Sequence, residues 1–293
     1  MSGIALPAPP GVALPRRLRA YARRSPLAAA GLLILGCFAL LAIFAPVIMP
    51  YDPVAADAAS VLRPPSAAHW FGTDANGMDV FSRVIYGTRY AFGIAIPAVA
   101  IAIAIGVPVG LVTGYAGGWL DEVLMRFFDA LRVFPSIILA LAVVSAAGAS
   151  VLNVVLVLGL LDTPVFARLV RSEVLALRSG SFVECAVAAG NPVRRVLFVH
   201  LMPNTLQGTL AQAAVRASWA VRLSTTFAFL GLGIQPPTPE WGTMIRQGAE
   251  YMVTGQWWIG VFPGAALILL SLGLNMAGDG LADLLDPRRR SAG

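Results

Sequence analysis

The stretch SFVECAVAAGNPVRRVLFVHLMPN, residues 181–204, lies between long hydrophobic runs and carries its own helix signals. Ser181 is followed three residues later by Glu184, which predicts a capping box and a short helix from Phe182. Gly190 predicts the end of this helix, because glycine adopts the left-handed C-terminal conformation without a steric penalty. The first half of the stretch therefore predicts one short helix.

The second half of the stretch predicts another helix. Asn191 and Pro192 have the residue types of an N-cap and a first helical position. Pro203 is expected to close this helix, because proline has no N–H to donate and its ring clashes with the preceding turn. The stretch as a whole predicts a compact helix–glycine–helix hairpin, whose role depends on the side of a membrane that it faces.

The composition around this hairpin indicates an integral membrane protein. Hydrophobic residues make up 58% of the 293 residues, charged residues make up 12%, and the mean hydropathy is +0.77. Soluble domains are about 45–50% apolar and about 25% charged. Every basic residue is an arginine, so the lysine of a P-loop is absent and the chain is not expected to hydrolyse ATP. Cys37 and Cys185 predict neither a disulfide framework nor a metal site.

Residues 27–49 form an uncharged run that is long enough to cross about 30 Å of hydrocarbon as a helix. The basic segment before it, residues 1–26, predicts a cytoplasmic tail. A cleaved signal peptide fits less well, because its apolar region spans about 7–15 residues. Residues 34–37 loosely resemble a lipoprotein box, but apolar sequence continues well past Cys37.

Five further membrane spans are predicted, at about residues 90–114, 123–147, 151–170, 206–232 and 257–277. With the first run, they predict an all-α protein of six transmembrane helices with both termini in the cytoplasm. Residues 50–89 and 233–256 are the predicted extracytoplasmic loops, and residues 79–87 are expected to form a short helix on the membrane surface. Residues 90–280 form the predicted core, and residues 281–293 a cytoplasmic tail. Most arginines flank the expected cytoplasmic segments, so the net charge of +6 indicates membrane orientation rather than nucleic-acid binding.

Three ionisable residues fall within the predicted spans: Asp162, Arg216 and Arg222. Such residues are costly in hydrocarbon and usually face a bundle interior or a cavity. At a rise of about 1.5 Å per residue, Asp162 and Arg216 lie at matching depths. Two interpretations stay open. One is a buried ion pair of Asp162 with either arginine that fixes helix packing, and the other is a translocation path in which the arginines meet a carboxylate of the cargo.

At this point the residues show a resemblance to the membrane subunits of ABC importers. Their cytoplasmic signature is E-A-A-x-x-x-G followed by a segment that ends in L-P. The matching residues here are Glu184, Cys185, Ala186, Gly190 and Pro203. Cys185 stands where the signature has alanine, and Met202 stands where it has leucine.

More specifically, residues 15–290 resemble the second, or C-type, permease subunit of dipeptide, oligopeptide and nickel importers. The motifs that carry this resemblance are FGTDxxGxDVxSR at 71–83, GYxGGWxD at 114–121, ARLVR at 167–171, FLGLGxQPPTPEWG at 229–242 and NxxGDGLxDxLDPR at 275–288. The chain departs from the family pattern at Met78, where arginine is usual, and at Arg222, where an acidic residue is frequent.

The resemblance implies the transmembrane domain of a type I ABC importer, with half of the translocation path formed by this chain. The hairpin is expected to dock on a cytoplasmic ATPase subunit through Glu184, Cys185, Ala186, Ala189, Gly190 and Pro203, with Glu184 acting also as the capping acid. The extracytoplasmic loops are expected to meet a solute-binding protein through Asp74, Asp79, Arg83, Pro236, Glu240 and Trp241.

The implied partners are a second, similar permease subunit that forms a heterodimer with this chain, and two ATPases that bind ATP and Mg²⁺. The chain itself is expected to hold no cofactor, to bind no metal and to catalyse no reaction. The expected cargo is a di- or oligopeptide, and nickel or another small solute is the alternative.

Two other classes of membrane protein fit the sequence less well. A secondary transporter needs a coupling-ion site near the midplane, for which Asp162 is a lone candidate. A membrane enzyme or receptor needs clustered catalytic groups or a signalling domain. His69 and His200 are expected on opposite sides of the membrane, so they cannot form such a cluster or a metal site together.

Overall fold

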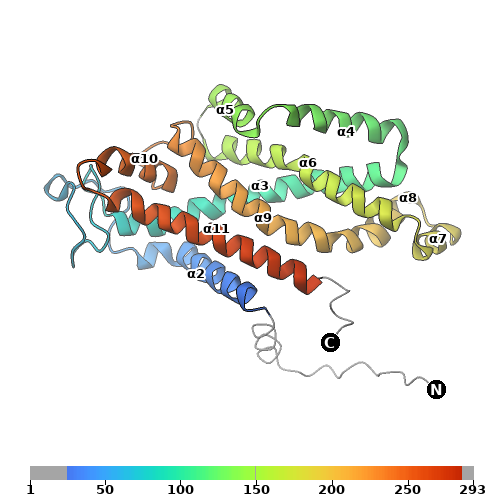
Figure 1. The fold of residues 1–293 in the computed structure, drawn as a ribbon, viewed down its shortest axis with the longest axis horizontal. Coiled ribbons are helices and arrows are strands. Elements are labelled where there is room, and N and C mark those ends of the chain that lie inside the picture. Colours follow the sequence, from blue (N-terminus) through green and yellow to red (C-terminus); the bar gives the residue numbers. More distant parts are fainter. Residues whose placement is uncertain (1–24, 149, 286–293) are drawn as a thin grey trace, which may run out of the picture.

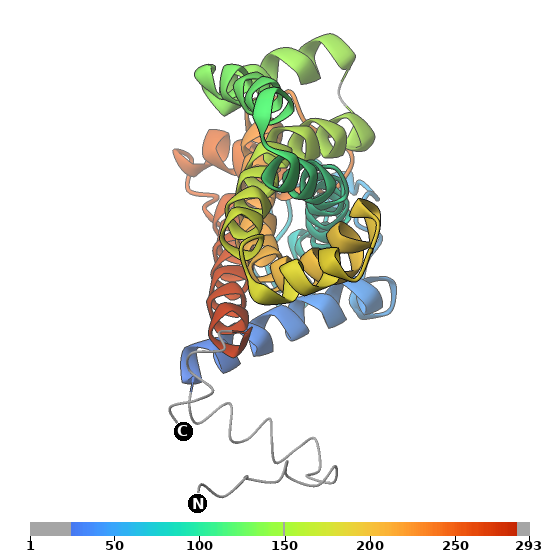
Figure 2. The same ribbon diagram turned by 90° about the vertical axis from the view of Figure 1, so that its right-hand side faces the viewer.

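The computed structural model describes residues 25–148 and 150–285, and the regular elements of this part are helices. Four of them are long and apolar enough to cross a membrane: α2 (Pro26–Ile48), α3 (Val80–Ala116), α6 (Val151–Leu177) and α11 (Trp258–Leu285). With α9 (Met202–Phe229) they form an elongated bundle (Figure 1). Helices α2 and α4 (Gly118–Val133) lie on opposite sides of this bundle (Figure 2). The predicted all-α membrane class is confirmed.

The centre of the bundle is the contact between α3 and α6. Gly106, Gly110 and Gly114 recur every four residues on α3, so they share one helix face. A Cβ atom at Gly106 would lie 2.8 Å from the Cβ of Phe166, and one at Gly110 would lie 2.5 Å from the carbonyl oxygen of Ala167. These glycines therefore let the two backbones approach closely, as small residues do between membrane helices.

Helix α2 packs against the bundle on one side only. Pro26 lies in its first turn, where the missing N–H costs no hydrogen bond. Gly31 faces α11 so closely that a Cβ atom would lie 2.5 Å from the Cβ of Met276. On the other side Leu33 and Val47 are 69% and 83% exposed. The helix predicted at 27–49 is thus present, and its unpacked face is as apolar as a lipid-facing surface.

Helix α3 is longer than the sequence predicts. A separate surface helix at 79–87 was expected before a span at 90–114, but a single helix of 37 residues runs through both. Gly87 does not interrupt this helix. The Trp241 ring packs directly against Gly87, and a Cβ atom at Gly87 would lie 2.6 Å from the ring nitrogen. A long-range contact therefore holds the backbone helical at a residue that favours a break.

The predicted span at 123–147 is wrong as a continuous helix. It is divided into α4 and α5 (Ser136–Ala147), which meet at 87°. Pro135 causes the break: it has no N–H for the helix, and it holds Phe134 in an extended conformation with φ −79° and ψ 137°. The turn before α4 is also shorter than expected, because the left-handed Gly117 and Gly118 complete it and α4 begins at once.

Pro203 does not close the second helix of the hairpin, as the sequence predicted. The short α8 (Val193–Arg195) continues through a π-helical segment (Val196–Leu201) directly into α9. The wider π turn bonds the N–H of Met202 to the carbonyl of Leu197, five residues earlier. Pro203 then lies in the first turn of α9, where a proline is tolerated.

The two ends of the bundle carry different structures (Figure 1). One end holds the hairpin, residues 181–204, with helix α7 (Ser181–Ala188). The opposite end holds a segment that we call the cap, residues 50–79 and 233–257. The second part of the cap was predicted as a loop, but it contains helix α10 (Trp241–Met252). The predicted tails lie outside the described residues, apart from their innermost positions.

Candidate functional site

The first helix of the hairpin begins at Ser181, one residue earlier than predicted, and its N-cap is Gly180. No side-chain hydrogen bond caps it, so the predicted capping box is wrong. The reason is that Ser181 is already helical and cannot take the extended conformation of an N-cap, which Gly180 takes instead with ψ 143°. Glu184 lies in the first turn, where its negative charge interacts favourably with the helix dipole.

The hairpin turns at Gly190, as predicted, with a left-handed φ of +76°. Asn191 ends the first helix rather than starting the second, which corrects the predicted N-cap. Its side-chain amide and its backbone N–H both donate to the carbonyl oxygen of Ala186, at 2.8 and 3.3 Å, and so satisfy a carbonyl at the end of the helix. Pro192 is the N-cap of the next helix.

The hairpin buries one face and exposes the other. Val183 and Ala186 are buried on the bundle side, where Val183 belongs to an apolar cluster with Val174 and Leu201. The exposed members of the predicted docking set are Glu184, Cys185, Ala189, Gly190 and Pro203. Ala186 therefore serves to seat the hairpin on the bundle, and the exposed surface beside it combines small side chains, the Glu184 carboxylate and the apolar side chains of Phe182 and Val187.

The three ionisable residues that were predicted within spans lie in two environments. Asp162 on α6 forms an ion pair with Arg216 on α9, and the guanidinium of Arg216 lies 4.5 Å from the centre of the Trp219 ring. Asp162 is 1% exposed. Arg222 is exposed and donates a hydrogen bond to the hydroxyl of Ser218. The structure therefore settles the open question of the partner: Asp162 pairs with Arg216.

Arg222 lines a groove beside the break between α4 and α5. The groove also contains Pro135, Ser136, Trp219 and Thr226, so a charged group and two hydroxyls converge where the helix is interrupted. Arg222 has no acidic partner among the described residues. Of the three residues, Arg222 is thus the one whose charge is free to meet another molecule.

In the cap, two predicted acidic residues are buried and hold the chain together. Asp74 is 2% exposed and accepts hydrogen bonds from the N–H groups of Asn76 and Met78, at 2.8 and 3.0 Å. Asp79 is the N-cap of α3 and accepts a 2.8 Å hydrogen bond from the N–H of Ser82. His69 approaches the same carboxylate, with Nδ1 3.0 Å from Oδ1.

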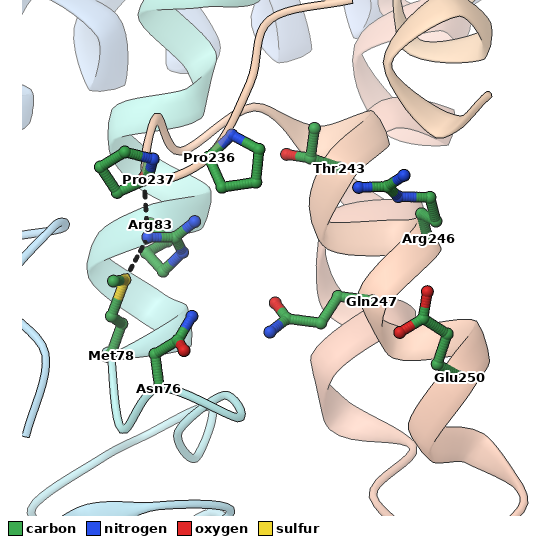
Figure 3. A pocket seen from close by; sticks show the side chains of 9 residues that line it. All are labelled: Asn76, Met78, Arg83, Pro236, Pro237, Thr243, Arg246, Gln247 and Glu250. Atoms are coloured by element: carbon green, nitrogen blue, oxygen red, sulfur yellow. Dashed lines mark hydrogen bonds between the residues drawn. The ribbon is translucent and has the colours of Figure 1, made fainter. Parts of the chain in front are cut away.

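Arg83 connects three parts of the cap and is 4% exposed. Its Nε lies 3.6 Å from the Asp74 carboxylate. One terminal nitrogen donates to the carbonyl oxygens of Pro53 and Pro237, at 2.7 and 3.2 Å, and to the sulfur of Met78 (Figure 3). Met78 is the position at which the sequence departs from the pattern of the permeases that it resembles, which usually have arginine there. In this chain Met78 is neutral and accepts a hydrogen bond from Arg83.

Glu240 and Trp241 anchor the second part of the cap. Glu240 accepts hydrogen bonds from the N–H groups of Gly242 and Thr243, at 2.7 and 3.0 Å, and so caps α10. Its burial raises its pKa from 4.5 to about 8. Trp241 is 2% exposed and donates a 3.0 Å hydrogen bond to the carbonyl oxygen of Val84. Of the six residues predicted to contact a binding protein, Pro236 is the one that lies exposed.

The sequence prediction missed a polar cavity in the cap, between α3 and α10 (Figure 3). Its α10 side is lined by Thr243, Arg246, Gln247 and Glu250, and Asn76, Met78 and Arg83 face them. The α10 residues recur at intervals of three and four, which is the spacing of one helix face. This periodicity within the predicted loop is the signal that could have revealed both the helix and its polar side. The described residues hold no group of three or more metal-ligating side chains.

Comparison with known families gives two matches. Residues 106–291 match the family described as "Binding-protein-dependent transport system inner membrane component". Residues 16–65 match the family described as "N-terminal TM domain of oligopeptide transport permease C". The two matches lie in order along the chain, and together they include α2, the last part of α3, the helices that follow it and the hairpin.

Curated relatives match nearly the whole chain. The "Dipeptide transport system permease protein DppC" of Alkalihalophilus pseudofirmus is 40% identical over 92% of this chain and 88% of the relative. The "Probable D,D-dipeptide transport system permease protein DdpC" of Escherichia coli is 39% identical over 90% and 88%. The "Glutathione transport system permease protein GsiD" of Pectobacterium atrosepticum is 38% identical over 93% and 90%.

The fold is also similar to that of solved structures, of which we name one. It is a chain of the MetNI methionine ABC transporter in an inward-facing conformation, with a TM-score of 0.57 and 20% identity, covering 70% of this chain and 96% of that chain. At this level of identity the likeness concerns the fold alone.

Proposed function

This chain belongs to the family of binding-protein-dependent transport system inner membrane components, and we propose that it forms half of the membrane pathway of an ATP-driven peptide importer. The family consists of membrane subunits of bacterial importers.

Short peptides are the cargo that the relatives support. The three relatives named above carry dipeptide, D,D-dipeptide and glutathione in their names, and all three ligands are short peptides. Each match covers about nine-tenths of both chains, so the similarity is not confined to the ATPase-facing part. Nickel or another small solute is the second candidate from the sequence, and no named relative favours it.

For the topology we propose six membrane spans with both termini in the cytoplasm. Four helices, and the bent pair α4–α5, meet the criteria of length and apolarity. Helix α9 is the sixth span. It is long enough, and its ion-paired Arg216 faces Asp162 inside the bundle, where a charge is tolerable. Arginines near the hairpin support its cytoplasmic location.

The hairpin is the proposed element that couples ATP hydrolysis to the membrane helices. The observation that supports this role is that the hairpin is continuous with two helices of the bundle. The turn after Leu177 leads from α6 into α7, and α8 continues without a break into α9. These same two helices are joined by the Asp162–Arg216 ion pair. A displacement of the exposed hairpin by an ATPase is therefore transmitted along both helices to the middle of the bundle, as a two-state importer requires.

Arg222 is the residue that we place in the translocation path. It lies exposed at the α4–α5 break, and no carboxylate of the described residues neutralises it. A peptide carries a free carboxylate, for which an arginine is the natural partner. Arg216 and Asp162 support the path as packing elements, because their charges satisfy each other.

The proposed assembly contains a second, similar permease subunit, two ATPases and an extracytoplasmic binding protein. ATP and Mg²⁺ are bound by the ATPases, and this chain contributes no catalytic group. The binding protein is expected at the cap, which lies at the opposite end of the bundle from the hairpin.

The test is a pull-down of the intact chain and of a Glu184→Lys, Gly190→Trp variant from the native membrane. We expect two ATPases and a second permease with the intact chain, and loss of the ATPases with the variant. A Glu122→Lys variant on exposed α4 is the matched control and should retain them. Absence of ATPases from the intact chain would refute the proposal, as would peptide uptake that needs an ion gradient instead of ATP.

A further inference from the structure

We propose that the cavity between α3 and α10 binds the charged termini of a short peptide before the peptide enters the membrane. This inference rests on the peptide-importer function proposed above. The cavity lies in the cap, and its volume is about 180 Å³. By this measure one water needs about 10–15 Å³, so about a dozen water-sized groups fit. The smallest dipeptides, which have roughly that number of non-hydrogen atoms, match this capacity.

Arg246 is the cation that makes the cavity suited to a carboxylate. Its side chain is half-buried and, among the described residues, makes no ion pair and no hydrogen bond. Arg83 differs, because Asp74 lies beside it and backbone carbonyls accept its N–H groups. Arg246 therefore brings an uncompensated positive charge to the cavity wall. Its planar guanidinium can bind a carboxylate through two parallel hydrogen bonds.

Glu250 supplies the opposite charge one helical turn further along α10. It too has no ion pair within the described residues. Four residues of helix separate the two positions by about 6 Å along the axis. An extended dipeptide spans at most about 7 Å, so its carboxylate and ammonium have a comparable separation. A zwitterionic dipeptide can thus meet Arg246 and Glu250 at the same time.

The two charges do not neutralise each other, although their spacing permits it. Glu122 and Arg126 on α4 have the same spacing in the favourable order, with the acid first, and their oxygen and nitrogen lie 2.7 Å apart. In α10 the order is reversed, which is the weaker arrangement for a pair on a helix. Arg246 and Glu250 therefore remain available to a ligand.

Amide side chains complete the cavity. Asn76 and Gln247 lie on opposite walls and point toward the space between α3 and α10 (Figure 3). Each amide can donate to a carboxylate or accept from an ammonium or a peptide N–H. Such groups suit the backbone of a peptide, whatever its side chains are. The cavity therefore fits a ligand that is recognised by its termini and its amide bond.

The experiment uses the purified complex of all subunits and alanyl-alanine as the probe. Saturation-transfer NMR without the binding protein compares the free dipeptide with its C-amidated and N-acetylated forms. We expect the wild-type complex to bind the free dipeptide about tenfold more tightly than the amide, and Arg246→Gln to remove that difference. Glu250→Gln should remove the preference over the acetylated form. Arg126→Gln is the matched control and should change neither.

Uptake in proteoliposomes separates the possible failures. If the wild-type complex takes up no dipeptide with ATP, the proposed function fails. If it does, and Arg246→Gln binds the free dipeptide as the wild type does, only this inference is overturned. It is also overturned if Arg246→Gln abolishes the stimulation of ATP hydrolysis by loaded binding protein, because the cavity then serves protein docking. Should Arg246→Gln fail to assemble, Glu250→Gln and Gln247→Ala decide the question by the same binding measurement.

Discussion

The hairpin and the cap lie at opposite ends of one bundle, and they use charged side chains in opposite ways (Figure 1). In the hairpin, Glu184 is exposed and accepts no hydrogen bond that caps the helix. In the cap, Asp74, Asp79 and Glu240 are buried and cap turns and helices of the same chain. An acidic residue of a motif can therefore be exposed to a partner or built into the scaffold of its own chain, and burial distinguishes the two roles.

Removal of Arg83 is expected to have the largest effect on stability. Arg83→Ala leaves the buried Asp74 carboxylate without its cation and frees the carbonyls of Pro53 and Pro237. Breaking a buried pair in this way costs about 3–5 kcal/mol. Thermal unfolding in detergent measures the loss. Arg89→Ala, on the exposed side of the same helix, should change the midpoint little, and equal losses would show that the cap is not held by Arg83.

The buried Glu240 predicts a pH dependence of the stability of the cap. Its pKa is near 4.5 in the unfolded chain and about 8 in the folded chain. Between these two pH values the folded chain holds a proton on Glu240 that the unfolded chain releases. The stability that this proton contributes is fully present below pH 4.5 and is lost as the pH rises toward 8. The slope is at most about 1.4 kcal/mol per pH unit. Unfolding midpoints from pH 5 to 8 test this, and Glu240→Gln should flatten the dependence.

Trp241→Phe tests the hydrogen bond between α10 and α3 with a smaller expected effect. The substitution keeps an aromatic ring but leaves the carbonyl of Val84 without its indole donor. The carbonyl keeps its hydrogen bond from the Thr88 hydroxyl, so the expected cost is that of one lost hydrogen bond, about 0.5–1.5 kcal/mol. Trp257→Phe in the same cap is the matched control, because no side-chain hydrogen bond of Trp257 lies within the described residues. A loss no greater than the control's would contradict the structural role of this bond.

The hairpin should show the smallest change in stability and the largest change in partner binding. Glu184→Gln alters an exposed charge and should change the free energy of unfolding by less than about 0.5 kcal/mol. Its affinity for the ATPase subunits should nevertheless fall, by about tenfold if the carboxylate meets a cation there. Microscale thermophoresis with the purified ATPase measures this. If Glu184→Gln lowered the unfolding midpoint but left the affinity for the ATPase unchanged, Glu184 would have a structural role like that of the cap acids. The difference between the hairpin and the cap would then be contradicted.

Local signals explain the parts of the fold that the sequence predicted well. The run at 27–49 forms α2, because twenty or so apolar residues have few alternatives to a membrane helix. Gly190 ends α7 with a left-handed conformation. The depths of Asp162 and Arg216 matched because helical rise is constant, and the two residues are paired.

The failures come from two kinds of interaction, a packing contact between segments distant in sequence and local hydrogen bonds that propensities do not include. Gly87 was expected near the end of a short helix, but Trp241 packs against it from the other part of the cap. Asn191 was expected to start a helix, but its amide bonds back to the preceding one. Pro203 was expected to end a helix, but a π segment accommodates it. In each case a neighbouring group supplied an alternative bond that propensity alone does not register.

The sequence by itself determined that this chain is an all-α membrane protein of a transport family, because hydropathy and ordered motifs are properties of the chain alone. Tertiary structure decided which charges are free. It paired Asp162 with Arg216 and left Arg222 exposed, and it buried the acids of the cap while leaving Arg246 unpaired at a cavity. The physical reason is that the cost of a charge depends on its surroundings, and those surroundings exist only once distant helices have packed.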